Sequence, residues 1–290
     1  SRRPLYILIV CTLTNLVLDL AFVLLFHMGV AGAGLATILS QAISALLVLY
    51  FLSRSNECYK LTVRKIRFHS DILRHIIKIG LPAGIQSSMF CISNIIIQST
   101  INTFGTDTMA AWTAYGKIDS VFWMLMSAFG ISITTFSGQN FGCGKLDRVK
   151  KSVRISLAMA LGSSMLLSAI LLLLGQYIFL LFTDDGNVLE LGVHILRTLV
   201  PFYATYVLVE VLSGAIRGTG ESLRPMLISG FGICVLRIVW ITCFLGADSH
   251  LNMVLYSYPI SWAFTSLLFL IYYLRGNWLK KRIYETSLSL

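Results

Sequence analysis

Eight long apolar stretches run through this chain, and they constrain its fold more than any other feature. A helix needs about 20 apolar residues to cross a hydrocarbon core of ~30 Å. Barrel strands would instead alternate polar and apolar residues over about ten positions. Only a helix satisfies its own backbone hydrogen bonds in lipid at this length, so we predict an all-α integral membrane protein with eight transmembrane helices. The stretches are 5–26, 30–52, 79–103, 109–136, 153–182, 188–214, 226–245 and 251–274.

The composition excludes a soluble protein. Apolar residues make up 56% of the 290 residues, the mean hydropathy is +0.79, and charged residues make up 12%, about half the usual share. A soluble globule must cover its surface with polar groups, and this chain has too few of them. The net charge of +10 does not imply a nucleic-acid partner, because Lys and Arg set the orientation of a membrane protein.

The basic residues mark one side of the membrane. Twenty of the 23 Lys and Arg residues fall in alternate connections or at the termini. The opposite connections, 26–30, 103–109, 182–188 and 246–250, contain no Lys or Arg. By the positive-inside rule, both termini of this segment are expected on the cytoplasmic side of the plasma (inner) membrane.

Motifs for ATP use, metal binding and nucleophilic catalysis are absent from the sequence. It contains no Walker motif, no HExxH and no GxSxG, and its six cysteines show no CxxC spacing. We therefore expect neither an enzyme nor a protein with a bound cofactor, apart from Na⁺ or H⁺ as a coupling ion.

An internal repeat predicts the domain organisation. The sequence SRRP at 1–4 recurs as SLRP at 222–225, and the same offset relates Arg54 to Arg275. Both copies begin and end on the inner side, so the repeat is parallel. The expected parts are the last two helices of an N-terminal lobe (1–52), a basic cytoplasmic linker (53–78), a six-helix C-terminal lobe (79–275) and a cytoplasmic tail (276–290).

If the two halves are equal, four further helices are expected before Ser1, and this chain alone is expected not to transport. The linker suits either an amphipathic helix on the inner leaflet or a plain orientation-setting loop. Pro82, Pro201 and Pro259 are expected to kink their helices.

A series of motifs, taken in order, resembles the multidrug and toxic compound extrusion (MATE) family over essentially the whole chain. The motifs are 15–19 (NLVLD), 29–37 (GVAGAGLAT), 80–82 (GLP), 117–120 (KIDS), 138–145 (GQNFGCGK) and 212–221 (LSGAIRGTGE). The resemblance implies two six-helix lobes, with the fold class here being part of that 6+6 bundle. It also implies a secondary antiporter that exports organic, often cationic, compounds in exchange for Na⁺ or H⁺ by rocking of the lobes.

The expected partners are small-molecule xenobiotics and the lipid bilayer, and the protein is expected to be a monomer. The alternative function is a lipid-linked saccharide flippase of a related fold. Such proteins usually have a more basic central cavity, whereas the spans here offer only Lys117, Arg197 and Arg237.

Asp19 is the first candidate for coupling, because an ionised carboxylate inside the bilayer is costly and therefore functional by default. Asn15 lies one turn away on the same helix face, and Thr37 lies on the next, antiparallel helix. Together they offer hard oxygen ligands suited to Na⁺, and Asp19 could instead carry a proton. The resemblance implies the same assignment. The simpler alternative is a carboxylate hydrogen-bonded to Asn15.

The second lobe offers candidates for lining a substrate cavity. Asp119 lies near mid-span and Glu210 near the inner end of another span, and Arg237 could be a counter-charge for either acid. One branch of the family carries acids in this lobe at the positions of Phe90 and Tyr206, so that acidic site is expected to be absent. Tyr206 is itself expected to line the cavity, and a polar stripe on the third span completes the set: Gln86, Asn94, Gln98 and Asn102. The alternatives are a buried polar network for Asp119 and helix–helix hydrogen bonds for the stripe.

Overall fold

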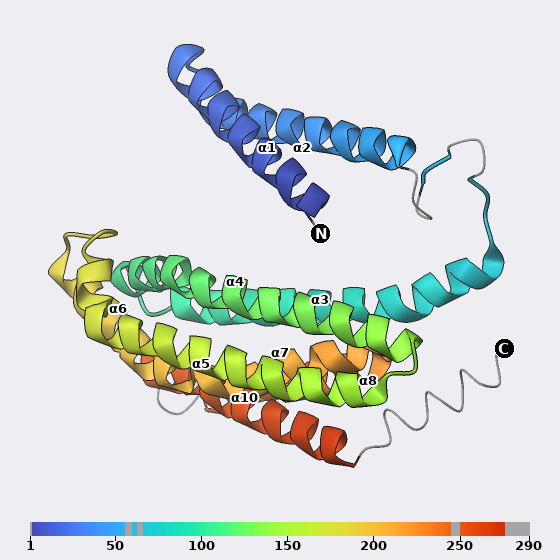
Figure 1. Cartoon of the computed structure of the whole chain (residues 1–290). Coiled ribbons are helices and arrows are strands. Elements are labelled where there is room, and N and C mark those ends of the chain that lie inside the picture. Colours follow the sequence, from blue (N-terminus) through green and yellow to red (C-terminus); the bar gives the residue numbers. More distant parts are fainter. Residues whose placement is uncertain (1, 56–59, 63–65, 245–249, 276–290) are drawn as a thin grey trace. The chain divides into compact units, whose positions relative to one another are not determined.

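The computed structural model describes residues 2–55, 60–62, 66–244 and 250–275 (Figure 1). The regular elements in this part of the chain are all helices, and it contains no strand. The chain divides into two compact units, Ser1–Ser70 and Asp71–Leu290. The predicted tail 276–290 and most of the connection 246–250 lie outside the described residues.

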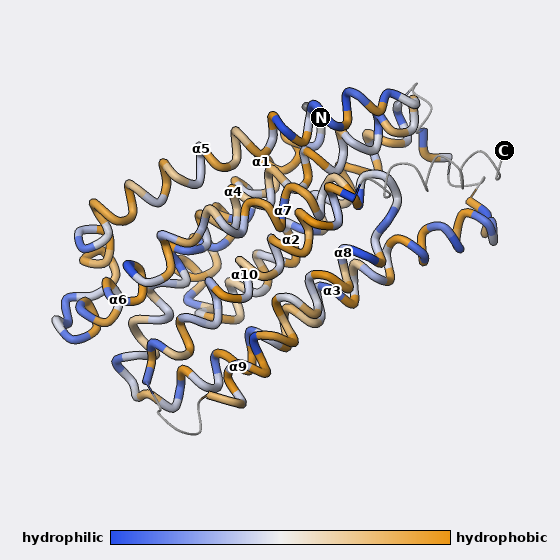
Figure 2. Tube along the Cα trace, turned by 90° about the horizontal axis from the view of Figure 1, so that it is seen from below, coloured by the Kyte–Doolittle hydropathy of each residue, from blue (hydrophilic) through white to orange (hydrophobic). Residues whose placement is uncertain are grey.

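The eight predicted spans are confirmed. The described chain contains eight helical segments long and apolar enough to cross a membrane: Pro4–Leu25, Gly29–Arg54, Ser70–Asn102, Thr106–Gly142, Leu146–Phe179, Gly186–Gly218, Leu223–Phe244 and Leu251–Leu274. Apolar residues follow these helices along most of their length (Figure 2). Several helices begin earlier or end later than hydropathy alone indicates, because a helix does not stop where its apolar stretch meets the membrane surface.

The first unit is a helical hairpin. Helix α1 (Arg2–Leu20) continues into a π-helical turn (Ala21–Leu25), and α2 (Gly29–Arg54) returns beside it. Small residues bring the two helices close, since Gly32, Ala36 and Ser40 are the buried positions of α2. The Cys11 thiol donates a hydrogen bond to the backbone carbonyl of Ser40 across this interface, at 3.4 Å.

The second unit is a bundle built around one buried helix. Helix α7 (Tyr203–Gly218) packs against α4 (Thr106–Gly142), α5 (Leu146–Phe179) and α10 (Leu251–Leu274). Most of its side chains are buried, which explains why its residues are apolar on nearly every face. The remaining elements are α3 (Ser70–Asn102), α6 (Gly186–Leu199), α8 (Leu223–Ser229) and α9 (Leu236–Phe244).

Helix α3 begins inside the predicted linker. Residues from Ser70 onwards continue into the span without a break, so this part of the linker is neither a separate helix nor a loop. Asp71 lies in the first turn, where a carboxylate favourably meets the positive end of the helix dipole.

One of the three prolines interrupts its helix and the other two do not. Pro201 lies in a 3₁₀ turn (Val200–Phe202) that separates α6 from α7 within one span. Pro82 and Pro259 lie inside α3 and α10, which continue as helices on both sides. A further interruption, which the sequence does not indicate by any proline, is the π-helical turn Gly230–Val235 between α8 and α9.

Glycines allow α4 and α7 to approach closely. A β-carbon at Gly218 would lie 2.5 Å from the carbonyl oxygen of Thr134 and 2.8 Å from the β-carbon of Ser137. The Thr134 hydroxyl also donates to the carbonyl of Gly214 across the same interface, at 3.0 Å. Small residues at such contacts are a general means of packing helices in membranes.

We expect Gly218→Ala to destabilise the second unit by about 1–3 kcal/mol, the usual cost of overpacking a tight contact. The matched control is Gly116→Ala on α4, where the added methyl group meets no atom within 4 Å. The measurement is thermal unfolding of the purified protein in detergent. Equal melting temperatures for the two variants would contradict the close contact.

Candidate functional site

The second unit contains a cavity of about 500 Å³ between α3 and the helices facing it, and polar side chains of the spans line it. Helix α3 contributes Asn94 and Gln98, and α4 contributes Asp119. Its other lining residues are mainly aromatic or apolar: Phe90, Ile97, Trp112, Trp123, Tyr206, Tyr258 and Trp262, together with Arg237. A mostly apolar cavity of this size with a few polar groups is typical of a small-molecule binding site.

Five of the six aromatic rings of this cavity, all except Phe90, form one continuous wall. The ring centroids of Trp123 and Tyr206 are 4.7 Å apart, and those of Tyr258 and Trp262 are 5.7 Å apart. Trp112 extends the wall towards the ends of α3 and α4, with its ring 5.8 Å from that of Tyr258. Most of these pairs meet edge to face or tilted, the arrangement that the ring quadrupoles favour.

Asp119 is held in place by aromatic donors. The indole nitrogen of Trp123 donates to Oδ2 at 2.6 Å, and the Tyr203 hydroxyl donates to Oδ1 at 2.5 Å. The Tyr115 hydroxyl lies 3.0 Å from that of Tyr203 and extends the network. The polar network that we considered for Asp119 is therefore present, although Ser120 is not part of it, since its hydroxyl donates to the carbonyl of Lys117.

The sequence could have indicated two of these residues. Tyr115 precedes Asp119 by four residues and Trp123 follows it by four, so all three share one face of α4. Tyr203 belongs to α7, and it joins the network only because α7 lies in the centre of the bundle.

Arg237 lines the same cavity but is not a direct counter-charge. It is 3% exposed, its guanidinium lies 4.0 Å from the Tyr258 ring centroid, and Nη2 donates to the Ser261 hydroxyl at 3.2 Å. Within the described part of the chain it forms no ion pair with Asp119 or Glu210. The expected pairing is wrong, because the ring of Tyr258 and a serine hydroxyl take its place.

Two buried donors of this cavity have no hydrogen-bond partner among the described residues. They are Nε of Arg237 and the indole nitrogen of Trp262, which is 1% exposed. Unpaired donors are costly away from water. Both atoms are closed off from solvent, so an acceptor group of a bound molecule would reach them only after a neighbouring side chain moves.

A second, smaller cavity of about 160 Å³ contains the other predicted residues of the second unit. Gln86 and Glu210 line it, and Glu210 pairs with Arg217 at 3.5 Å and accepts a hydrogen bond from Tyr206 at 3.3 Å. Tyr206 and Phe90 line both cavities. The polar stripe of α3 thus faces two cavities, with Gln86 in the smaller one and Asn94 and Gln98 in the larger.

The remaining polar residues of these spans lie elsewhere. Asn102 accepts a hydrogen bond from Gln98 at 2.9 Å. Lys117 is exposed and lines a separate depression with Met109 and Phe182, on another face of α4 from Asp119.

In the first unit, Asn15 and Asp19 are brought together by the helix, whereas Thr37 is not. Nδ2 of Asn15 and Oδ1 of Asp19 are buried without a hydrogen-bond partner among the described residues, so Asn15 does not donate to Asp19. Thr37 is exposed, and its hydroxyl donates to the Ala33 carbonyl of its own helix at 2.9 Å. It lies beside the buried face of α2 rather than on it.

The ligand set expected for Na⁺ is therefore only partly assembled. The described residues contain no cluster of three or more His, Cys, Asp or Glu that could hold a metal ion. The unpartnered Oδ1 of Asp19 is nevertheless a hard oxygen donor of the kind that Na⁺ prefers, whereas the unpartnered atom of Asn15 is the amide nitrogen, which does not bind a cation.

A family model described as MatE matches residues 82–242, more than half of the chain. The chain belongs to the MATE family. Members of this family are membrane transporters and not enzymes, so the resemblance seen in the motifs and the multi-pass membrane fold are confirmed.

Two curated MATE relatives align with almost the whole chain. It is 26% identical over 284 residues to the probable multidrug resistance protein YpnP of Bacillus subtilis, covering 98% of this chain and 63% of that protein. It is also 26% identical over 297 residues to the probable multidrug resistance protein NorM of Thermotoga maritima, covering 98% and 62%. The chain thus spans less than two thirds of the length of these relatives.

Solved structures share the MATE fold of this chain. A crystal structure of MATE in the bent conformation matches with a TM-score of 0.86 at 22% identity, over 97% of this chain and 63% of that one. A MOP superfamily transporter from Pyrococcus furiosus matches with a TM-score of 0.87 at 21% identity, over 95% and 62%.

We expect Tyr203→Phe to lower the stability of the second unit by about 0.6–1.7 kcal/mol, the range of hydrogen bonds between membrane helices. The change removes one donor to Asp119 and keeps the ring stacked 3.9 Å from that of Phe122. The control is Tyr256→Phe on α10, an exposed tyrosine. The melting temperatures of both variants are measured by thermal unfolding in detergent. An equal decrease for the two variants would exclude the Asp119 hydrogen-bond network as the cause of the destabilisation.

Proposed function

We propose that the protein carrying this chain is a secondary active multidrug antiporter. It exports organic, often cationic, compounds from the cell in exchange for Na⁺ or H⁺, by rocking between inward- and outward-facing states. It works as a monomer in the plasma membrane, with both ends of this segment in the cytoplasm. Membership of the MATE family supports this proposal, together with relatives described as probable multidrug resistance proteins.

The observation that carries the proposal is the carboxylate of Asp119 in an aromatic cavity. An organic cation gains from a carboxylate and from the faces of tryptophan and tyrosine rings, and both line the same space here. Trp123 and Tyr203 fix the position of the carboxylate, so the Asp119 side chain loses little conformational entropy when a ligand binds. Varied rings along one wall also allow cations of different shapes to bind.

Coupling is assigned to Asn15 and Asp19 in the first unit. The buried Oδ1 of Asp19, which lacks a partner among the described residues, gains one when Na⁺ or a proton enters, and Asn15 would offer its amide oxygen. Thr37 becomes a third ligand only if its hydroxyl leaves the Ala33 carbonyl. Such a change would let the ion favour one conformation over the other, which ion-driven transport requires.

Arg237 and Trp262 favour the second candidate, a flippase for lipid-linked saccharides. Their unpartnered donors would suit a phosphate or another acceptor group in the same cavity. Binding of polyprenyl-phosphate lipids to the purified protein distinguishes the two functions. The flippase function would replace the antiporter function if two results were found together. The lipid would bind saturably in a way that Arg237→Gln abolishes, and drug efflux would be absent.

We expect Asp119→Asn to weaken the binding of a cationic dye such as ethidium about 10–100-fold, the worth of one charged contact. Binding of an uncharged dye should be unchanged. The measurement is fluorescence polarisation with the purified protein. Asp107→Asn, an exposed acid in the first turn of α4, is the control. Equal losses for charged and uncharged dyes would contradict the role of the carboxylate.

We expect Asp19→Asn to abolish dye efflux driven by an ion gradient while leaving dye binding intact. The carboxylate that exchanges the ion is then lost, and the cavity of the second unit is untouched. Efflux is followed in cells lacking other drug pumps, with Asp184→Asn, an exposed acid outside the helices, as the control. Unchanged efflux by Asp19→Asn would overturn the coupling assignment.

A further inference from the structure

We propose that a groove between α4 and α5 binds one anionic phospholipid on the cytoplasmic side of the membrane. The groove has a volume of about 440 Å³ and lies apart from both cavities described above. It shares no lining residue with them, so the inference does not depend on what the protein transports.

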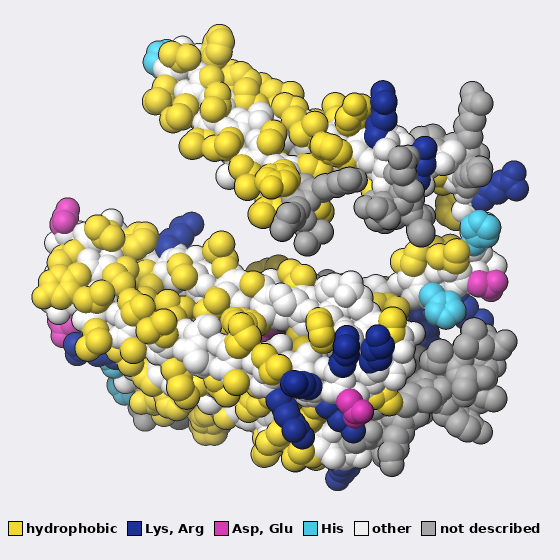
Figure 3. Space-filling view, in the orientation of Figure 1, with side chains coloured by type: hydrophobic (Ala, Val, Ile, Leu, Met, Phe, Trp, Pro, Cys, Tyr) yellow, Lys and Arg dark blue, Asp and Glu magenta, His cyan; other side chains and the backbone are white. Residues whose placement is uncertain are grey.

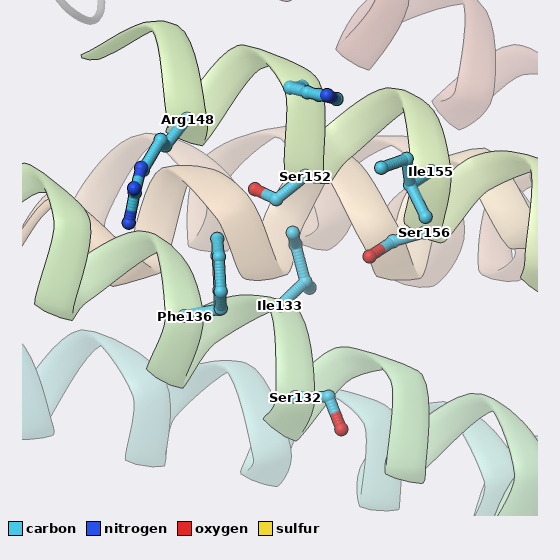
Figure 4. A pocket seen from close by; sticks show the side chains of 8 residues that line it. Ser132, Ile133, Phe136, Arg148, Ser152, Ile155 and Ser156 are labelled. Atoms are coloured by element: carbon cyan, nitrogen blue, oxygen red, sulfur yellow. The ribbon is translucent and has the colours of Figure 1, made fainter. Parts of the chain in front are cut away.

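The walls of the groove come from the ends of two antiparallel helices. Figure 4 shows Ile133 and Phe136 pointing from α4 towards α5, and Arg148 pointing from α5 back towards α4. Ile155 adds a further apolar side chain, and Lys151 a second positive charge. A basic site beside an apolar floor is thus formed where α4 and α5 meet.

The charge of the groove has one sign. Arg148 and Lys151 are both exposed, and no acidic residue is among the described residues that line it. Neither base forms an ion pair within the described ranges. Lys and Arg side chains gather at this end of the second unit (Figure 3), with five between residues 145 and 154. The groove therefore attracts an anion.

Polarity changes along the groove in the way that a phospholipid requires. Arg148 lies in the first turn of α5, next to the loop, whereas Ile155 lies about 14 Å inside the helix. On α4, Phe136 and Ile133 lie progressively further from the end at Gly142. Ser132 and Ser156 lie at the same depth as Ile133 and Ile155, so the deeper part of the groove is uncharged rather than purely apolar. A phosphate at the membrane surface would thus meet the charged part, and the start of its acyl chains would meet the uncharged part.

The charge pattern of the chain also supports an anionic lipid. The basic segment 145–154 is on the side predicted to be cytoplasmic, where the leaflet is negatively charged. Basic pockets between helix ends on that side are suited to lipid phosphates. A free phosphate would use Arg148 and Lys151 but would leave the apolar floor uncovered.

The test compares two double variants of the whole chain in phosphatidylcholine nanodiscs with added phosphatidylglycerol. R148Q/K151Q removes both charges of the groove. K145Q/K150Q removes two exposed charges from the same basic segment that do not line the groove. Native mass spectrometry counts the phosphatidylglycerol that each released protein retains.

We expect R148Q/K151Q to weaken phosphatidylglycerol retention about 100-fold, because each base would lose a charge-assisted hydrogen bond to the phosphate, with a much smaller change for K145Q/K150Q. Circular dichroism confirms that both variants fold. If both double variants lost phosphatidylglycerol equally, the basic residues would attract the leaflet only diffusely, and the proposed site would be overturned. Unchanged retention by R148Q/K151Q would overturn it as well.

Two further measurements exclude other occupants. Excess glycerol phosphate, the soluble headgroup, should not displace the lipid, whereas displacement would assign the groove to a free phosphate. Phe136→Ser should weaken retention while both bases remain. If the protein forms a dimer and R148Q/K151Q dissociates it, a second copy of the chain occupies the groove. That result would also contradict the proposal.

Discussion

The free-energy cost of placing a polar group in the hydrocarbon core of the membrane governs how the helices of this protein are arranged. Lipid offers no hydrogen bonds, so every polar side chain of a span must find a partner or a water-filled space within the protein. In the second unit this requirement collects Asp119, Glu210 and the polar stripe of α3 on surfaces that face one another. The two cavities lie between α3 and the rest of the bundle because that is where the polar faces meet.

Local signals in the sequence are sufficient to predict the helices and the family. Eight apolar stretches predict eight helices, since each helix satisfies its backbone by itself, and ordered motifs indicate the family. The stripe of Gln86, Asn94 and Gln98 was also visible, because residues four apart share a helix face. Helix ends were less accurate, as the start of α3 at Ser70 shows, because polar residues can continue a helix beyond the membrane.

Hydrogen-bond and ring-stacking partners that lie far apart in the sequence could not be predicted from it. Tyr203 follows Asp119 by 84 residues, and only the central position of α7 brings its hydroxyl to the carboxylate. The same applies to Arg237, whose charge suggested an acid as partner but which stacks on Tyr258. The division of the predicted site residues between two cavities likewise depends on Phe90 and Tyr206, whose side chains stand between them. Thr37 is the opposite example, a predicted partner that makes no such contact. It lies on the helix next to Asp19, but its hydroxyl bonds to its own helix.

The fit of Glu210 against Gly130 links backbone packing to charge. A β-carbon at Gly130 would overlap the carboxylate of Glu210, the group that pairs with Arg217 and accepts from Tyr206. A single methyl group on α4 would therefore displace the Glu210 carboxylate on α7 without altering any charge. The missing side chain at position 130 thus provides the space in which this carboxylate meets Arg217 and Tyr206.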